Sequence, residues 1–470
     1  MSDRAAELHS SGPESSIASR TEGSTAIWTG RNILLLALLL AASVCAYADR
    51  LILPLLQELV KPELKLSDAQ LGLATGPAFA AFYALSGIPI ARLAERFNRV
   101  RLLAGAIALW SAMTAACGAV SGLPTLLLAR LGVGFGEGGG VPVSHSLLSD
   151  HFPARQRGLA MAILSTGAPL AGIIMPPVGA YVAHVWGWRF AFLFLGILGA
   201  ALSALAALTL KDPRMSGEVR RHAANSFRTD LIWLLRSPAF LCLFVAGGLM
   251  GVGVAGFQVF MPSFLMRVHH LTLVEAGGAI GLFSIAGLCG TFAGGWIADR
   301  FAGRFGCSYP LTCAVGGLAT GSAYLLALRQ NDWHAALLCL LAAGFSTDLK
   351  TGPNYAAVQN LVPARMRATG AAVFMLAATL IGSSIGPTIA GMTSDRFAAA
   401  TFPARLGAFL KICPGGHAPA GAAPDIVTAC TTASASGLAG ALSVIALSFI
   451  LSSLAYLACS RFFRIHPDNL

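Results

Sequence analysis

The stretch LLLARLGVGFGEGGGVPVSHSLLSDHFPARQRG, from Leu126 to Gly158, decides how the rest of the chain is read. It carries two opposite charges, Arg130 and Glu137, inside an otherwise apolar and glycine-rich run. Residues at this spacing lie two turns apart on roughly one face of a helix. The run closes on a basic turn, Pro153-Ala154-Arg155-Gln156-Arg157. This pattern predicts a membrane helix whose charged face meets another helix or a cavity.

The composition is that of a membrane protein. Of the 470 residues, 56% are hydrophobic and only 11% are charged, whereas soluble domains average about 25% charged residues. Apolar runs long enough to cross a bilayer recur about twelve times. We predict segments over residues 32–56, 69–90, 101–121, 123–148, 158–182, 188–210, 239–266, 273–298, 309–328, 333–358, 368–392 and 438–459. The expected fold class is an all-α membrane protein with twelve transmembrane helices.

Positive charge is distributed unevenly over the loops that join these segments. With the N-terminus in the cytoplasm, 21 Lys and Arg residues lie in the tails and even-numbered loops, eight lie in odd-numbered loops, and three lie within segments. Cytoplasmic loops carry such an excess, so we expect both termini in the cytoplasm and, for a bacterial source, a place in the plasma (inner) membrane. Membrane topology thus explains the net charge of +11, which in a soluble protein would suggest nucleic-acid binding. We therefore exclude nucleic acid as a partner.

The chain consists of two related halves. ARLAERFNRVR at 91–101 matches WIADRFAGR at 296–304, and FPARQRGLAM at 152–161 matches VPARMRATGA at 362–371. The offsets are nearly equal, 204 residues for the first pair and 210 for the second. We therefore expect a polar tail over 1–30, a six-helix bundle over 31–210, a charged linker over 211–237, a second bundle over 238–460 and a tail over 461–470. Parallel repeats of six segments are a transporter design with the substrate site between the halves.

The motifs resemble those of the major facilitator superfamily. One loop is similar to its G-x-x-x-D-R-x-G-R-[RK] motif through Gly87, Glu95, Arg96, Asn98, Arg99 and Arg101, and the second copy runs from Gly294 or Gly295 through Asp299, Arg300, Gly303 and Arg304. Asp49-Arg50 at the end of the first segment, taken with Arg130 and Glu137, resembles the spinster-type subfamily. The resemblance implies two pseudo-symmetric six-helix bundles and a lysolipid- or sphingolipid-type substrate. It also implies a cytoplasmic gate made by Glu95, Arg96, Arg99, Asp299, Arg300 and Arg304.

Four charges in the first half form the candidate coupling site. Charges in the hydrocarbon are costly and need a reason. By depth in the membrane, Asp49 is the best matched partner of Arg130, while Arg50 reaches Glu137 only by extending its side chain inward. One interpretation is a switch in which protonation of a carboxylate frees its arginine for an anionic headgroup. The structural alternative is a permanent ion pair between segments one and four.

The second half repeats part of this pattern. Asp348 precedes Pro353 by five residues, as Glu137 precedes Pro142. We therefore expect the two acids at matching positions, with Lys350 neutralising Asp348 directly or through a neighbouring segment. Glycines of the fourth segment, including Gly134, Gly136 and Gly138, are expected to let segment one approach closely.

Cysteines and motif searches narrow the remaining choices. Cys413 and Cys430 both fall in the long loop that the topology places outside, where we expect a disulfide. No metal-ligand spacing, nucleotide-binding loop or catalytic triad is present, so we expect no enzyme, no metal and no cofactor beyond a proton gradient.

We accordingly predict a monomeric, proton-coupled transporter of an amphiphilic anion, in contact with membrane lipid. A transporter of small organic anions or drugs is the nearest alternative, and a non-transporting receptor or scaffold is the third.

Overall fold

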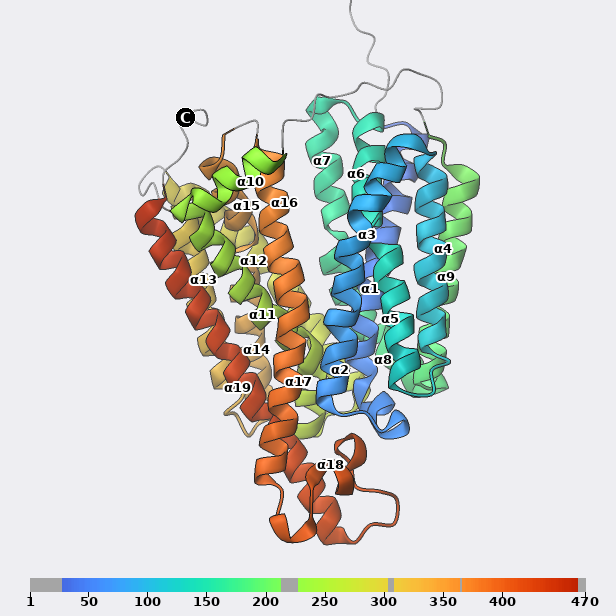
Figure 1. Ribbon diagram of the computed structural model, residues 1–470, viewed down its shortest axis with the longest axis vertical. Helices are drawn as coiled ribbons and strands as arrows, with labels where there is room; N and C mark the ends of the chain where they lie inside the picture. Colours follow the sequence, from blue (N-terminus) through green and yellow to red (C-terminus); the bar gives the residue numbers. More distant parts are fainter. Residues whose placement is uncertain (1–27, 213–226, 303–307, 364–365, 464–470) are drawn as a thin grey trace, which may run out of the picture.

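The computed structural model describes residues 28–212, 227–302, 308–363 and 366–463. All regular secondary structure in these residues is helical, and Figure 1 shows the helices as two groups that lie side by side. The first half comprises α1 (Gly30–Leu64), α2 (Asp68–Thr75), α3 (Pro77–Arg96), α4 (Arg99–Cys117), α5 (Leu123–Glu137), α6 (Gly140–His151), α7 (Ala154–Ser165), α8 (Gly167–Trp186) and α9 (Trp188–Thr209).

The second half follows the linker. It comprises α10 (Phe227–Arg236), α11 (Pro238–Val268), α12 (Leu273–Ala302), α13 (Ser308–Ala327), α14 (Trp333–Asp348), α15 (Thr351–Leu361), α16 (Arg367–Leu376), the π-helix η3 (Ala377–Ile381), α17 (Gly382–Thr401), the 3-10 helix η4 (Ala404–Leu406), α18 (Phe409–Ile412), the 3-10 helix η5 (Pro414–Gly416) and α19 (Pro424–Phe462). We call the end of the bundle at which α1 begins and α19 ends the termini side, and the opposite end the far side (Figure 1).

Twelve helical segments cross between these two sides. Ten helical spans in the described chain are long and apolar enough to cross a membrane, and three of them join consecutive helices: α2 with α3, α7 with α8, and α16 with η3 and α17. The other two crossings are broken helices, α5 followed by α6 and α14 followed by α15. The first break falls at Gly138 and Gly139, where glycine lowers helix propensity. The predicted number of crossings is thus confirmed, and the fourth and tenth each consist of two half-helices.

Several helices run further on the far side than the apolar pattern predicted. α1 ends at Leu64 instead of Leu56, α17 ends at Thr401 instead of Met392, and α19 begins at Pro424 instead of Leu438. The added turns contain polar and charged residues, which hydropathy assigns to loops. Several of these polar side chains bond to groups on other helices, as described below.

The two halves touch through close helix crossings on the far side. A side chain at Gly72 of α2 would collide with the carbonyl of Pro387 on α17, and one at Gly391 of α17 would collide with the carbonyl of Asp68. Backbones this close leave no room for side chains, so this crossing depends on glycine. The contact fixes α2 against α17.

The glycines of α5 serve different neighbours from those predicted. Gly134 faces the backbone of α3 at Phe79, and Gly136 faces α4 at Trp110. The expectation that they admit α1 is wrong, because α3 and α4 flank this face of α5 in the bundle.

Candidate functional site

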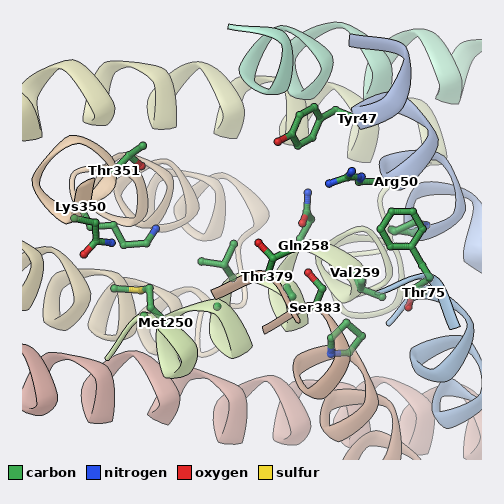
Figure 2. Close-up of a pocket in the computed structure, with 18 of the residues that line it drawn as sticks. Tyr47, Arg50, Thr75, Met250, Gln258, Val259, Lys350, Thr351, Thr379 and Ser383 are labelled. Carbon is green, nitrogen blue, oxygen red and sulfur yellow. The ribbon is translucent and has the colours of Figure 1, made fainter. Parts of the chain in front are cut away.

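A cavity of about 330 Å³ lies between the halves (Figure 2). The first half contributes Tyr47, Arg50, Pro54, Thr75, Phe79 and Arg130, and the second contributes residues of α11, α15, α16, η3 and α17. Figure 2 shows Arg50 and Lys350 at opposite ends of the cavity, with Gln258 and Thr379 between them. Aromatic and aliphatic side chains, among them Met250, Val254, Tyr355 and Phe374, cover much of the remaining wall. The cavity therefore combines cationic ends with a mixed wall.

An ion pair forms part of the wall on the first half. The Arg50 Nε donates to the Glu137 Oε2 at 2.8 Å. The Arg50 side chain is 22% exposed and that of Glu137 is 1% exposed, so only the arginine reaches the cavity. Its guanidinium carbon also lies 4.7–5.0 Å from the ring centroids of Tyr47, Phe79 and Tyr83. Cation–π contacts with three rings hold the arginine in place whether or not Glu137 is charged.

Asp49 and Arg130 do not form the ion pair that their depths suggested. The Arg130 Nη1 donates to the main-chain oxygen of Asp49 at 3.3 Å. Both carboxylate oxygens of Asp49 are buried with no hydrogen-bond partner in the described chain. Successive residues on a helix point about 100° apart, so α1 directs Arg50 toward Glu137 and leaves the neighbouring carboxylate without an ion pair. Depth along the membrane was predictable, but rotation about the helix axis was not.

Several other polar atoms around Asp49 are buried without a partner. They are the Thr114 hydroxyl, the Arg130 Nε and the Glu137 Oε1. Most buried polar groups in proteins are hydrogen-bonded, so such a cluster calls for an explanation. Together with the Arg50–Glu137 pair, it forms a cluster of buried acids and bases beside the cavity.

The breaks in the two halves carry matching acids. Glu137 is the last residue of α5 and Asp348 is the last residue of α14, which confirms their predicted correspondence. The Asp348 Oδ2 points at Gly287 of α12, whereas the Lys350 Nζ donates to the Thr347 carbonyl at 2.7 Å. No ion pair within 4 Å joins Asp348 to Lys350 in the described chain, so the expected direct neutralisation is not observed. Lys350 instead lines the cavity.

The residues expected to form a cytoplasmic gate act inside their own halves where they are described. Arg99 is fully buried and binds Asp212 through its Nη2 at 2.6 Å and Asp150 through its Nη1 at 2.7 Å. Asp212 follows α9 and Asp150 lies on α6, so Arg99 connects these two elements on the termini side of the first half. In the second half, Tyr309 donates to Asp299 at 3.4 Å.

Among the described residues, no hydrogen bond or ion pair joins Arg96 or Arg300 to the other half. Arg96 and Arg300 are exposed. The side chain of Glu95, and Arg304 as a whole, lie outside the described residues. The gate assigned by resemblance therefore stays a prediction.

A buried charge network on the far side was missed by the sequence reasoning. Arg267 of α11 binds Glu58 of α1 through Nη2–Oε1 at 2.6 Å and Nε–Oε2 at 2.9 Å. It also binds Asp68 of α2 with two hydrogen bonds of 2.8 Å, and Lys61 pairs with the same aspartate. All these side chains are 6% exposed or less. The network joins the first half to the second.

Hydrogen bonds extend this far-side network. Asp395 of α17 accepts from the backbone N–H groups of Asp68 and Ala69, at 3.1 and 2.9 Å, and so caps α2 from the other half. The signal in the sequence was a cluster of charges from Glu58 to Asp68 directly after an apolar run, with Arg267 closing the seventh segment. The segment boundaries predicted from hydropathy place these positions in loops.

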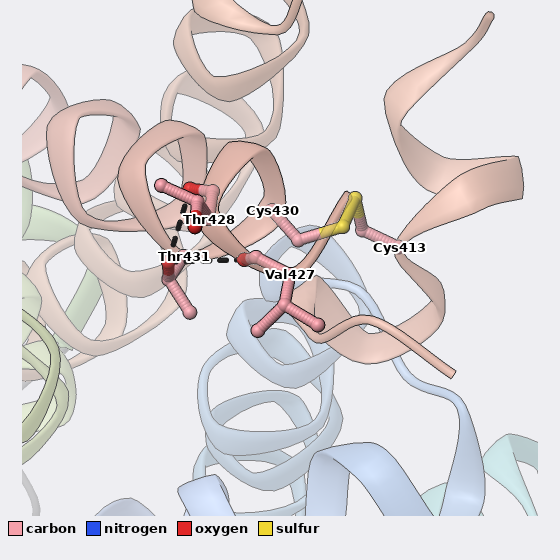
Figure 3. The surroundings of a disulfide bond; sticks show 5 residues. All are labelled: Cys413, Val427, Thr428, Cys430 and Thr431. Atoms are coloured by element: carbon pink, nitrogen blue, oxygen red, sulfur yellow. Dashed lines mark hydrogen bonds between the residues drawn. A yellow bond between two sulfur atoms is a disulfide. The ribbon is translucent and has the colours of Figure 1, made fainter. Parts of the chain in front are cut away.

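A disulfide-bonded loop lies against the network, and Figure 3 shows its disulfide bond. Cys413 is bonded to Cys430, as expected from the sequence. The His417 Nε2 lies 3.6 Å from the Glu58 Oε2. Gly415, at φ +70°, packs against the Lys61 carbonyl, where a side chain would both strain the backbone and collide. The loop is thus fitted to the outer end of α1.

Comparison with known proteins agrees with this architecture. The sequence profile of the Major Facilitator Superfamily matches residues 38–387. An MFS-type efflux pump of Mycolicibacterium smegmatis is 33% identical over 359 residues, which cover 74% of this chain and 81% of the relative. Protein spinster homolog 1 of Homo sapiens is 26% identical over 400 residues, covering 79% of this chain and 75% of that protein.

A solved structure is similar over nearly the whole chain. It is a bacterial homolog of the human lysosomal transporter Spinster in an inward-facing and unoccupied conformation. The TM-score is 0.82 at 27% sequence identity, and the match covers 93% of this chain and 99% of that one.

Proposed function

This chain belongs to the major facilitator superfamily as a spinster-like transporter, and from that premise we propose that it moves an amphiphilic organic anion in exchange with, or together with, protons. The observation that carries the proposal is the Arg50–Glu137 ion pair at the cavity wall, next to the unpartnered carboxylate of Asp49. A buried ion pair contributes little to stability by itself. A pair that opens to a cavity on its cationic side can exchange partners.

Protonation supplies the switch in this proposal. A proton on Glu137 removes the negative charge that holds Arg50, and the arginine stays in place because three rings surround it. The guanidinium then presents its remaining N–H groups to an acidic group of the substrate. Loss of the proton restores the pair and displaces the substrate. The Asp49 carboxyl group is buried and makes no ion pair in the described chain, so we propose that it carries a proton in this state.

The substrate class follows from the cavity. Arg50 and Lys350 favour an anion, and Met250, Val254 and Phe374 favour an attached apolar part. The volume of about 330 Å³ lies at the lower end for ligand cavities. It accommodates an acidic head and the start of a chain. The same volume, together with the polar Gln258, supports a small organic anion as the second candidate.

The conformation proposed is inward-facing. The far side is closed by the Arg267 network, and the positive-inside rule places that side outside the cytoplasm. We further propose a monomer with cytoplasmic termini, in the plasma membrane if the source is bacterial, with protons as the only coupling species and no cofactor.

Uptake into proteoliposomes tests the coupling. The probes are 1-oleoyl-lysophosphatidylglycerol and glucarate, each with and without an imposed pH gradient. Wild-type protein should show gradient-driven uptake of at least one probe, and Glu137→Gln and Asp49→Asn should each lose the gradient dependence. Glu63→Gln, on an exposed far-side acid, is the control and should behave as wild type. Gradient-driven uptake that survives in both test variants would disprove the coupling scheme.

A further inference from the structure

We infer that the second half contains its own anion-binding subsite, in which Lys350 and Asn354 hold the acidic group of the substrate while Arg50 is engaged by Glu137. The inference rests on the proposed function in one respect, namely that the cavity binds an anion. It adds where that anion sits in the present conformation. The subsite lies at the break between α14 and α15, across the cavity from Arg50 (Figure 2).

Lys350 is a cation with unused donors. Its ammonium group has three N–H bonds, and in the described chain one of them reaches the Thr347 carbonyl at 2.7 Å. No carboxylate of the described residues lies within 4 Å of it, and the nearby Asp348 is directed at Gly287 of α12. A membrane-buried cation without a counter-ion is costly. An anionic ligand in the cavity would offset that cost.

Asn354 is oriented by the residues behind it. Its Oδ1 accepts from the Tyr456 hydroxyl at 2.7 Å and from the Cys313 thiol at 3.3 Å. These partners belong to α19 and α13, neither of which contributes a residue to the cavity wall. The side-chain nitrogen therefore faces the cavity, which Asn354 helps to line. The residue is only 7% exposed, and the described structure shows no acceptor for that nitrogen.

The backbone adds a third component. α15 begins at Thr351, directly after Lys350, and Thr351 also lines the cavity. The N–H groups of the first turn of a helix lack intrahelical partners and favour anions; here Thr351 and Gly352 supply them, since Pro353 has none. An ammonium, a carboxamide N–H₂ and a helix N-terminus thus converge on one wall. All three supply donors, and an oxyanion such as a carboxylate, sulfonate or phosphate satisfies them together.

Arg50 and Lys350 differ in what they offer in this conformation. Arg50 already has a carboxylate partner, whereas Lys350 has only a carbonyl. An incoming anion therefore meets Lys350 first. Release of Arg50 by protonation of Glu137 would then provide the second position, on the opposite half.

Equilibrium binding to the full chain in nanodiscs, with no pH gradient, tests the subsite. The probes are 1-oleoyl-lysophosphatidylglycerol, glucarate and the uncharged lipid monoolein. Lys350→Gln should weaken binding of at least one anionic probe about tenfold or more. Asn354→Ala should weaken it severalfold, and Lys350→Arg should restore most of it. Monoolein should bind all variants within about twofold of the wild type, since it lacks the charge that the subsite reads.

One control variant and the absence of a pH gradient keep the outcomes separate. Lys411→Gln, an exposed lysine on α18, should bind as wild type. Because binding is measured without a gradient, a failure of proton coupling would leave the subsite standing. Dependence on Lys350 for the lysolipid alone, or for glucarate alone, supports the subsite and identifies the source of the anion. The inference is overturned if Lys350→Gln and Asn354→Ala bind both anions normally, or if neither anion binds the wild type at millimolar concentration.

Discussion

Replacing Arg267 with methionine would leave the carboxylates of Glu58 and Asp68 on the far side without the arginine that they share. In the closed state, that guanidinium makes four hydrogen bonds of 2.6–2.9 Å to the two acids, from a side chain that is 5% exposed. Glu58 and Asp68 belong to the first half and Arg267 to the second. The substitution therefore weakens the attachment between the halves more than the stability of either one.

The size of the effect follows from what remains after the change. Removing one partner of a buried ion pair costs about 3–5 kcal/mol. Lys61 still pairs with Asp68, and the hydroxyls of Ser263 and Ser394 still donate to the two acids, so the lower value applies. When the far side opens, the same acids become hydrated and the penalty disappears. About 3 kcal/mol corresponds to roughly a hundredfold shift toward the outward-open state.

Double electron–electron resonance measures this shift directly. Spin labels on unnatural amino acids at Lys65 and Asn331 report the far-side distance between the halves without modifying native cysteines. Arg267→Met should convert a short-distance population into a longer one. The control is Arg189→Met, which removes an exposed ion pair with Glu63 inside the first half. Exposed pairs contribute about 0–1 kcal/mol. An unchanged distribution in Arg267→Met, or an equal shift in the control, would refute the reasoning.

Four further outcomes are expected. Arg99→Met should destabilise the protein by about 3 kcal/mol in thermal unfolding, because two carboxylates lose their buried partner. Arg101→Met, at an exposed position, should change the melting temperature little. Equal melting temperatures for the two variants would contradict the prediction. Cys413→Ser removes a disulfide between residues 17 apart and should lower the free energy of unfolding by about 3 kcal/mol. The wild type in reductant should be destabilised to the same extent. Gly72→Val should lengthen the same far-side distances, because α17 leaves no room for the side chain. A hydrogen bond from a backbone N–H of α14 lowers the pKa of Asp332, so this helix cap stabilises the protein at pH values above the ordinary aspartate pKa. The stabilisation is lost as the pH falls through the lowered pKa. Asp332→Asn should therefore flatten the dependence of the free energy of unfolding on pH in that acidic range.

Hydropathy predicted the crossings because each crossing must satisfy its backbone internally and place apolar side chains toward lipid. The same reasoning failed at the helix ends. α1 continues for eight residues beyond Leu56, and hydropathy cannot distinguish a polar loop from a polar helix whose charges meet a partner helix. Glu58 and Lys61 are paired only because α11 and α2 bring their counter-ions to them. That information lies in tertiary packing.

The candidate site shows the same division. Spacing and rarity of charge identified Asp49, Arg50, Arg130 and Glu137, and the correspondence of Glu137 with Asp348 came from the internal repeat. The partner assignment was wrong because it used depth alone. Rotation of α1 relative to α5 decides whether Asp49 or Arg50 meets a partner, and that rotation is a property of the packed bundle. No single-helix pattern contains this constraint.

The far-side loop also has a practical consequence. At about 1.5 Å per residue, the 39 residues of α19 span roughly 58 Å, against a hydrocarbon core of about 30 Å. The helix therefore projects beyond the bilayer with the disulfide-bonded loop attached to it (Figure 1). The loop packs on α1 of one half and is anchored on α19 of the other. An antibody fragment raised against this composite epitope would recognise the closed far side selectively, and would give particle images a rigid fiducial outside the detergent belt.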